Sequence, residues 1–233
     1  MHAVILVGGL GTRLGELTKD TPKPMVEVPG TKKPILEFVV EGFKAGGITD
    51  YIFMESFMAH KIQDHFGDGH KFGININHVE LPLESGVAGA MRKGVENVPE
   101  DETNAIIALG DVVSNVDYKA LVARHEQAWE RGFQPIITGV ARPGRYGSFH
   151  PDGIYSTFAE KEPENLGIMC VNREWFIKIA PQTGSIEFMK DLPYGDIQNP
   201  YLHEGVFVDA GVPEDLALLG KMYSARGRIE NRG

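Results

Sequence analysis

Short apolar runs alternate with longer amphipathic segments along the first half of the chain. The apolar runs have the length and continuity of buried strands, and the longer segments repeat apolar positions with the period of a helix. Strands are expected at residues 3–7, 51–54, 74–79 and 105–109, and helices at 34–45, 59–66, 87–98 and 118–131. This order predicts an α/β, Rossmann-like fold, with a mostly parallel central sheet flanked by helices.

The pattern changes after Pro135. Turns rich in Gly, Pro and Asp separate further strands, which are expected at residues 136–141, 154–160 and 167–171. A last strand at 206–209 leads into a helix that begins with Pro213 and two acidic residues. We expect a single domain spanning 1–233, with a parallel half at about 1–132 and a mixed-strand half at about 133–233.

Composition narrows the class of protein. The formal charge of −9 argues against binding to nucleic acid or to an anionic membrane surface, which both favour clustered Lys and Arg. Cys170 is the single cysteine, so the chain has no disulfide framework and no cysteine-based zinc site. We find no signal peptide and no membrane helix, and therefore predict a cytoplasmic protein. A homo-oligomer is left open.

The first strand runs into a glycine-rich loop that contains Gly8, Gly9 and Gly11. Ligands of open α/β sheets bind at the carboxyl ends of the strands, and glycines let backbone N–H groups approach phosphate oxygens. The loop fits neither the dinucleotide fingerprint nor the P-loop motif. On its own it is equally compatible with a tight turn after the strand.

Lys23 lies between two prolines, Pro22 and Pro24. Pro24 disfavours the helical region for the preceding residue, so we expect Lys23 on a stiff, extended segment. A lysine held in a fixed direction suits a pre-placed cation for a phosphate group.

Together these segments resemble the signature of the sugar-nucleotide pyrophosphorylases, GGxGTRLxPLTxxxPKPMxxV. The sequence from Gly8 is GGLGTRLGELTKDTPKPMVEV, with Glu16 in place of the usual proline. The resemblance continues in the same order along the chain, through PLESGVAGA at residues 82–90, GD at 110–111, RYG at 145–147, FAEK at 158–161, NLGI at 165–168 and VDAG at 208–211. Glu162 departs from the family's EKP pattern by placing an acid beside Lys161.

The resemblance implies a GT-A-like nucleotidyltransferase fold, a nucleotide-binding first half and a sugar-binding second half. It implies transfer of a nucleotidyl group from a nucleoside triphosphate (NTP) to a sugar 1-phosphate, giving an NDP-sugar and pyrophosphate. The length is similar to that of the compact members acting on glucose, mannose, heptose or N-acetylmuramate 1-phosphate.

The resemblance also implies the residues of the site. Mg²⁺ is expected as the cofactor, bound by Asp111 and Asp209. The expected catalytic residues are Arg13, Lys23 and Asp111. The expected nucleotide-binding residues are Leu6, Gly8, Gly9, Gly11, Thr12, Arg13, Lys23, Gly86 and Asp111. Gly147, Glu160, Lys161 and Asn165 are expected to bind the sugar phosphate.

Other interpretations stay open at this point. Asp111 and Asp209 could each be an ordinary turn residue after a strand. A glycosyltransferase of similar fold would also bind a nucleotide and a metal, but typically through D-x-D, whereas Val112 and Val113 follow Asp111. A non-catalytic sugar-nucleotide sensor is the third interpretation.

Overall fold

The computed structural model describes residues 1–132, 136–140, 148–149, 155–156, 164–185, 201–203 and 205–230. For residues 136–140, 148–149, 155–156, 164–165, 202 and 225–230, it describes the backbone alone. All structural statements below concern these residues.

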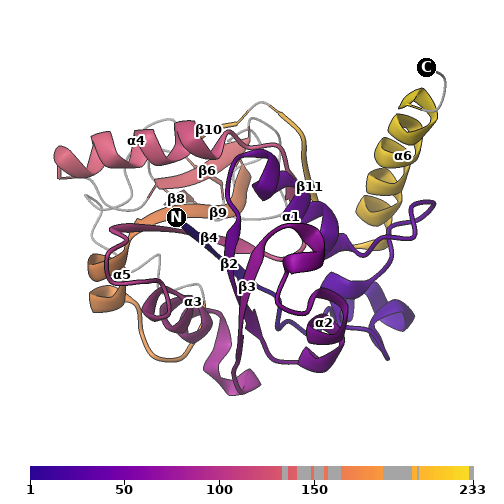
Figure 1. The fold of residues 1–233 in the computed structure, drawn as a ribbon, viewed down its shortest axis with the longest axis horizontal. Coiled ribbons are helices and arrows are strands. Elements are labelled where there is room, and N and C mark those ends of the chain that lie inside the picture. The colour runs from indigo at the N-terminus through magenta and orange to yellow at the C-terminus, as the bar shows by residue number, and fades with distance from the viewer. Residues whose placement is uncertain are drawn as a thin grey trace.

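A central sheet of nine described strands runs through the molecule (Figure 1). Seven of the strands follow the order β10-β6-β9-β4-β1-β2-β3. These strands are β1 (His2–Leu6), β2 (Asp50–Glu55), β3 (Asn75–Glu80), β4 (Asn104–Leu109), β6 (Ile136–Val140), β9 (Glu164–Asn172) and β10 (Tyr201–Leu202). The two short strands β7 (Ser148–Phe149) and β8 (Tyr155–Ser156) pair beside β9. Strands β3, β2, β1 and β4 are parallel, whereas β9 is antiparallel to both β4 and β6. The expected mostly parallel central sheet, with mixed strands beside it, is therefore confirmed.

Side chains of a strand alternate between the two faces of the sheet, and here both faces are covered by helices. On β1, Ala3 and Ile5 join a core with side chains of α1 (Ile35–Ala45), α2 (Ala59–Phe66), α4 (Tyr118–Glu130) and α6 (Pro213–Glu230). Val4 faces the other way, into a second core with side chains of α3 (Gly86–Glu96) and α5 (Arg173–Ile179). Among the described helices, none is both long and apolar enough to cross a membrane.

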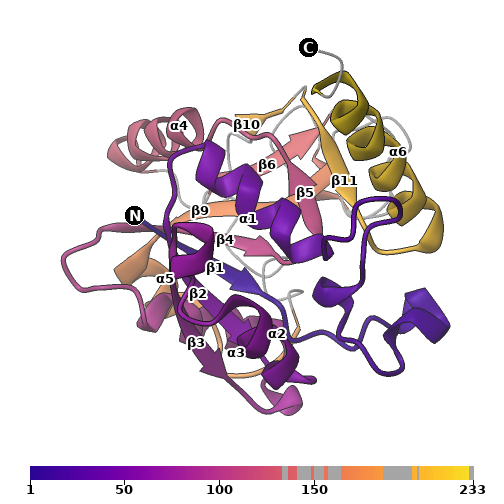
Figure 2. The same cartoon turned by 45° about the vertical axis from the view of Figure 1, so that its right-hand side comes forward.

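A short antiparallel ribbon lies outside the sheet, beside α1 and the start of α6 (Figure 2). It consists of β5 (Val112–Ser114) and β11 (Phe207–Asp209), with Asp209 opposite Val112. The ribbon ties the segment after β4 to the segment before α6. It thereby joins parts of the chain that are almost one hundred residues apart.

The structure adds elements that the hydrophobic pattern did not predict. These are β5, β7, β10 and α5, together with four single-turn or short 3-10 helices: η1 (Thr12–Thr18), η2 (Lys23–Met25), η3 (His70–Phe72) and η4 (Leu83–Ser85). Strand β9 is also longer at both ends than the expected 167–171. Of the expected strand at 154–160, only residues 155–156 lie in the described ranges.

Candidate active site

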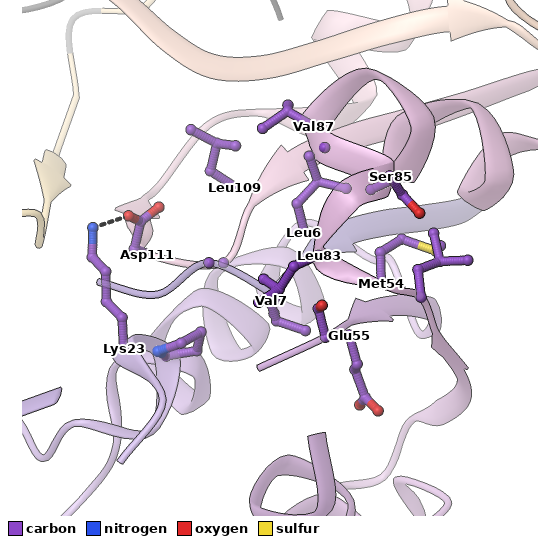
Figure 3. Close-up of a pocket in the computed structure, with 18 of the residues that line it drawn as sticks. Leu6, Val7, Lys23, Met54, Glu55, Leu83, Ser85, Val87, Leu109 and Asp111 are labelled. Carbon is purple, nitrogen blue, oxygen red and sulfur yellow. Dashed lines mark hydrogen bonds and ion pairs between the residues drawn. The ribbon is translucent and has the colours of Figure 1, made fainter. Parts of the chain in front are cut away.

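The carboxyl ends of β1, β2 and β4 border a cavity of about 270 Å³ beside the first turn of α3 (Figure 3). Leu6, Met54 and Leu109 come from the strand ends, and Val87 and Ala90 come from α3. Most of the lining is thus apolar. A cavity of this character suits a flat aromatic ring, which buries apolar faces and presents its polar groups at its edges.

The ion pair of Lys23 and Asp111 lies at one end of the cavity. In Figure 3, Lys23 and Asp111 are joined on one side of the cavity, whereas Ser85 lies on the opposite side. Gly8 and Gly9 also line the cavity, where the loop leaves β1. The cavity therefore runs from an apolar region near α3 to a charged region beside the glycine loop.

The glycine loop packs directly against Lys23. Gly11 has a φ of 66°, in the left-handed region, and a Cβ atom there would lie 2.6 Å from Lys23 Cβ. Any larger residue would push Lys23 away, so glycine at this position lets the loop and the lysine approach. The Thr18 hydroxyl stabilises the loop, because its Oγ1 donates hydrogen bonds to the carbonyl oxygens of Gly11 and Gly15, at 3.0 and 3.1 Å.

The structure brings six of the expected nucleotide-binding residues to the cavity lining. They are Leu6, Gly8, Gly9, Lys23, Gly86 and Asp111. The other three expected residues do not line the cavity. Gly11 packs against Lys23, and Thr12 and Arg13 are exposed at the start of η1.

The expected extended conformation of Lys23 is wrong. Lys23 begins the 3-10 turn η2, in which the Met25 N–H donates to the Pro22 carbonyl at 2.8 Å and the Val26 N–H donates to the Lys23 carbonyl at 3.1 Å. These two hydrogen bonds outweigh the preference that Pro24 imposes on its neighbour. The turn and the burial of Lys23, which is 7% exposed, give the side chain the fixed direction that was expected of an extended segment.

Lys23 contacts carboxylates from two distant parts of the chain. Its ammonium forms an ion pair with Asp111, and its Nζ lies 3.9 Å from Asp209 Oδ1. The β5–β11 ribbon brings the two aspartates together, and the Ala210 N–H donates to the Asp111 carbonyl at 2.9 Å. The three side chains are between 9% and 17% exposed, so water screens their charges only in part.

The two aspartates fit a magnesium ion. Mg²⁺ prefers oxygen ligands and is usually held by one or two carboxylates, with substrate phosphates and water in its other positions. Two carboxylates against one ammonium also leave an excess negative charge at this end of the cavity. Within the described ranges, no group of three or more His, Cys, Asp or Glu side chains is arranged to hold a metal. Asp111 and Asp209 would suit a metal whose other positions are filled by phosphate oxygens and water.

Three expected sugar-phosphate residues, Gly147, Glu160 and Lys161, lie outside the described residues. Asn165 is described at the backbone only, in β9, where it pairs with Gly139 of β6. The roles of these four residues stay predictions.

A buried carboxylate beside the glycine loop was not predicted from the sequence. Glu55, labelled in Figure 3, is the last residue of β2. Its side chain is fully buried. Gln63 of α2 donates to Glu55 Oε2 at 2.7 Å, and His78 Nδ1 lies 2.5 Å from Oε1. The hydrogen bond with Glu55 raises the pKa of His78, and a further bond from Nε2 to the Gly67 carbonyl acts in the same direction. Since both ring nitrogens face acceptors, the charged imidazolium satisfies the network best.

The sequence did carry one signal for Glu55. The rule that ligands gather at the carboxyl ends of parallel strands applies to β2 as well as to β1 and β4. Met54, Glu55 and Ser56 all line the cavity at that position.

The mostly parallel sheet, its flanking helices and its mixed strands are those of the GT-A-like fold that the sequence predicts. The chain belongs to the nucleotidyl transferase family, whose family model matches residues 2–172. It is 31% identical to the mannose-1-phosphate guanyltransferase of Neurospora crassa over 92% of this chain, and it spans 62% of that relative's length. It is also 31% identical to the glucose-1-phosphate cytidylyltransferase of Salmonella typhi, over 76% of this chain and 74% of that relative.

Solved structures agree on the fold. The crystal structure of HddC from Yersinia pseudotuberculosis complexed with GMP-PN superposes with a TM-score of 0.79, covering 95% of this chain and 99% of that one. The two sequences are 24% identical, so this likeness bears on the fold alone.

Proposed function

We propose that this chain transfers a nucleotidyl group from an NTP to a sugar 1-phosphate, forming an NDP-sugar and releasing pyrophosphate. The observation that carries the proposal is the apolar cavity that ends at the ion cluster of Lys23, Asp111 and Asp209. The apolar end suits the base, and the charged end suits the phosphates. The similarity to guanyl and cytidylyl transferases acting on sugar 1-phosphates supports the same reaction class.

The reaction makes modest demands on proton transfer. An oxygen of the sugar 1-phosphate attacks the α-phosphorus, and the bond from the α-phosphorus to the bridging oxygen of the β-phosphate breaks. The attacking phosphate has a second pKa near 6, by analogy with phosphoserine, and is already anionic near neutral pH. The protein must instead hold two anions together and neutralise the charge that develops on the leaving pyrophosphate.

The described residues can meet that demand. Lys23 lies at the cavity end where the α-phosphate would sit, and Gly8 and Gly9, whose backbone N–H groups would be available to phosphate oxygens, line the same cavity. Asp111 and Asp209 would hold Mg²⁺, which supplies positive charge at the phosphate oxygens. Arg13, exposed beyond the cavity, would bind the outer phosphates through its planar guanidinium.

The second half of the chain would bind the acceptor. Gly147, Glu160, Lys161 and Asn165 are proposed to hold the sugar and its phosphate, with Lys161 as the phosphate's cation. Since the relatives act on mannose or glucose 1-phosphate with guanyl or cytidylyl transfer, GTP and CTP with these two sugars are the first pairs to test.

A matrix of NTPs against sugar 1-phosphates, with Mg²⁺, tests the proposal. We expect at least one pair to release pyrophosphate and to form an equal amount of NDP-sugar, measured by a coupled phosphate assay and by chromatography. Failure of every pair to release pyrophosphate would refute the proposal. Transfer of sugar from an added NDP-sugar to an acceptor would support a glycosyltransferase instead.

A further inference from the structure

One face of α3 carries Gly86, Gly89 and Arg92 at a spacing of three residues. This face packs against α5 and the segment that follows it, residues 180–184, which we name the strap. The strap comes after the long β9 strand of the second half, whereas α3 belongs to the first half. The two halves of the chain therefore meet here, behind the apolar end of the cavity.

Gly184 of the strap forms two backbone hydrogen bonds across the start of α3. Its N–H donates to the Ser85 carbonyl at 3.1 Å, and its carbonyl accepts from the Ala88 N–H at 2.9 Å. The second bond satisfies one of the N–H groups that the first turn of a helix leaves without a partner. The strap thus brackets Ser85, Gly86 and Val87, and these three residues line the cavity.

The contact depends on glycine at two positions of α3. A Cβ atom at Gly86 would lie 2.3 Å from the Gly184 carbonyl oxygen, and one at Gly89 would lie 2.4 Å from the Gln182 carbonyl oxygen. Both obstacles are backbone atoms, which cannot rotate away as a side chain can. The two glycines let the strap approach α3 at backbone distance.

Arg92 anchors the start of the strap. Its Nη1 donates to the carbonyls of Ile177 and Ala180, the latter at 2.6 Å. Its Nε donates to Glu96 at 3.0 Å, which orients the guanidinium along α3. These carbonyls lie at the carboxyl end of α5, where a cation also complements the helix dipole.

We propose that the strap, held by Arg92, is a positioning element for the nucleoside, because it fixes the Ser85–Val87 turn that forms one wall of the cavity. Strap residues do not line the cavity within the described ranges, so they act through that turn. The inference rests on the proposed function, since it assigns the apolar end of the cavity to the base. It adds a specific consequence, namely that a change in the strap alters nucleotide binding more than sugar-phosphate binding.

Gly184→Ala tests the strap without touching the cavity wall. Gly184 has a φ of 120°, which alanine rarely adopts, yet a Cβ atom there would meet nothing within 4 Å. The variant therefore strains the strap backbone and creates no clash. Gly132→Ala is the matched control, because Gly132 also has a positive φ, 84°, and open space around it, but it follows α4.

We expect Gly184→Ala to raise the Kd for the NTP, measured by calorimetry without sugar phosphate, by about tenfold, since small displacements of a binding wall are costly. The KM for sugar 1-phosphate at saturating NTP should change less than about twofold. Gly132→Ala should leave both constants unchanged, although its midpoint of thermal unfolding should fall by a similar amount.

Arg92→Ala provides a second test from the other side of the contact, with Lys93→Ala as its control. Lys93 is the next residue on α3, and its side chain is 50% exposed. We expect Arg92→Ala to raise the NTP Kd as Gly184→Ala does, and Arg92→Lys to restore only part of the affinity, because a single ammonium lacks the guanidinium fork.

Wild-type binding and turnover separate this inference from the proposed function. The positioning role is overturned if the wild type transfers nucleotide and both Gly184→Ala and Arg92→Ala bind NTP as tightly as Gly132→Ala does. The same holds if the loss appears equally in the sugar-phosphate KM. A wild type that binds no NTP would overturn the proposed function, and the strap proposal with it.

Discussion

The Lys23 ammonium lies against one carboxylate and within 4 Å of another, in a region that water reaches only in part. Such a cluster is costly to bury unless the charges compensate one another. An arriving triphosphate adds negative charge on the same side of the cavity. Under the proposed function, Lys23 would then be a cation shared between protein and substrate, and its effect would grow as charge moves to the leaving pyrophosphate.

We therefore predict that Lys23→Ala lowers kcat/KM by about 10² or more, because removal of one charge-stabilising group typically costs that much. The KM for sugar 1-phosphate should stay near its wild-type value. Lys19→Ala is the control, since Lys19 is on the same loop but its side chain is 65% exposed. If Lys23→Ala abolishes only sugar-phosphate binding, the roles assigned to Lys23 and Lys161 are exchanged.

A second prediction concerns His78, whose pKa in the folded protein is raised by its bond with Glu55. A raised pKa means that the folded state binds the proton more tightly than the unfolded state. The stabilisation is complete below the unfolded value of about 6.5 and is lost as pH rises through the folded pKa.

His78→Gln should therefore lower the free energy of unfolding more at about pH 6 than at about pH 9. Urea unfolding of wild type and variant across this range measures the difference. His60→Gln, on the exposed side of α2, is the control. A difference that is constant with pH would show that His78 is not the charged partner of Glu55.

At the scale of elements, the β5–β11 ribbon brings Asp111 and Asp209 together, and Gly42 of α1 packs closely against this ribbon. A Cβ atom at Gly42 of α1 would lie 2.6 Å from the Ser114 carbonyl oxygen of β5. The helix and the ribbon thus touch through backbone at this position. A larger residue would displace β5, and with it the pairing that holds Asp209 beside Asp111.

Gly42→Ala is predicted to destabilise the protein by about 1–3 kcal/mol, the usual cost of overpacking, despite alanine's better helix propensity. The rate of nucleotide transfer by the remaining folded protein should fall as well. The neighbouring Glu41→Ala, whose side chain is 49% exposed, should change neither by much. An unchanged free energy of unfolding for Gly42→Ala would contradict the tight contact.

The hydrophobic pattern was enough to predict the long elements and the β11 strand, but not β5, its partner in the ribbon. Val112–Ser114 is only three residues long and directly follows a turn, so no period can be detected. Helix α5 had a usable signal, because Asn172 accepts a hydrogen bond from the Trp175 N–H at 3.0 Å and caps the helix. That signal is hidden where β9 runs into the helix without a loop.

At the scale of the whole molecule, the predictable part of the site is the part in which each residue carries its own local signal. Gly8 and Asp111 lie in short motifs at strand ends, Lys23 lies between two prolines, and all three line the cavity. The Glu55–His78 bond and the Gly184 contact join segments 23 or more residues apart, and no local spacing encodes them. These contacts could be identified only from the folded chain.

We also predict that turnover needs a divalent metal, because Asp111 and Asp209 would otherwise face a polyanion. Excess chelator should stop product formation, and added Mg²⁺ should restore it. Asp111→Asn should lower the rate far more than it lowers the free energy of unfolding. Full turnover in chelator would refute the metal site, and a normal rate for Asp111→Asn would place it elsewhere.

In the proposed reaction the α-phosphorus of the NTP is the atom attacked, and a label placed in the triphosphate identifies that atom. The enzyme is given an accepted NTP labelled with ³²P at either the α or the γ position, together with sugar 1-phosphate and Mg²⁺. We predict that the α label appears in the NDP-sugar and the γ label in pyrophosphate, in equal amounts. Transfer of the γ label to the sugar phosphate would contradict attack at the α-phosphorus. So would release of the α label as a nucleoside mono- or diphosphate that carries no sugar.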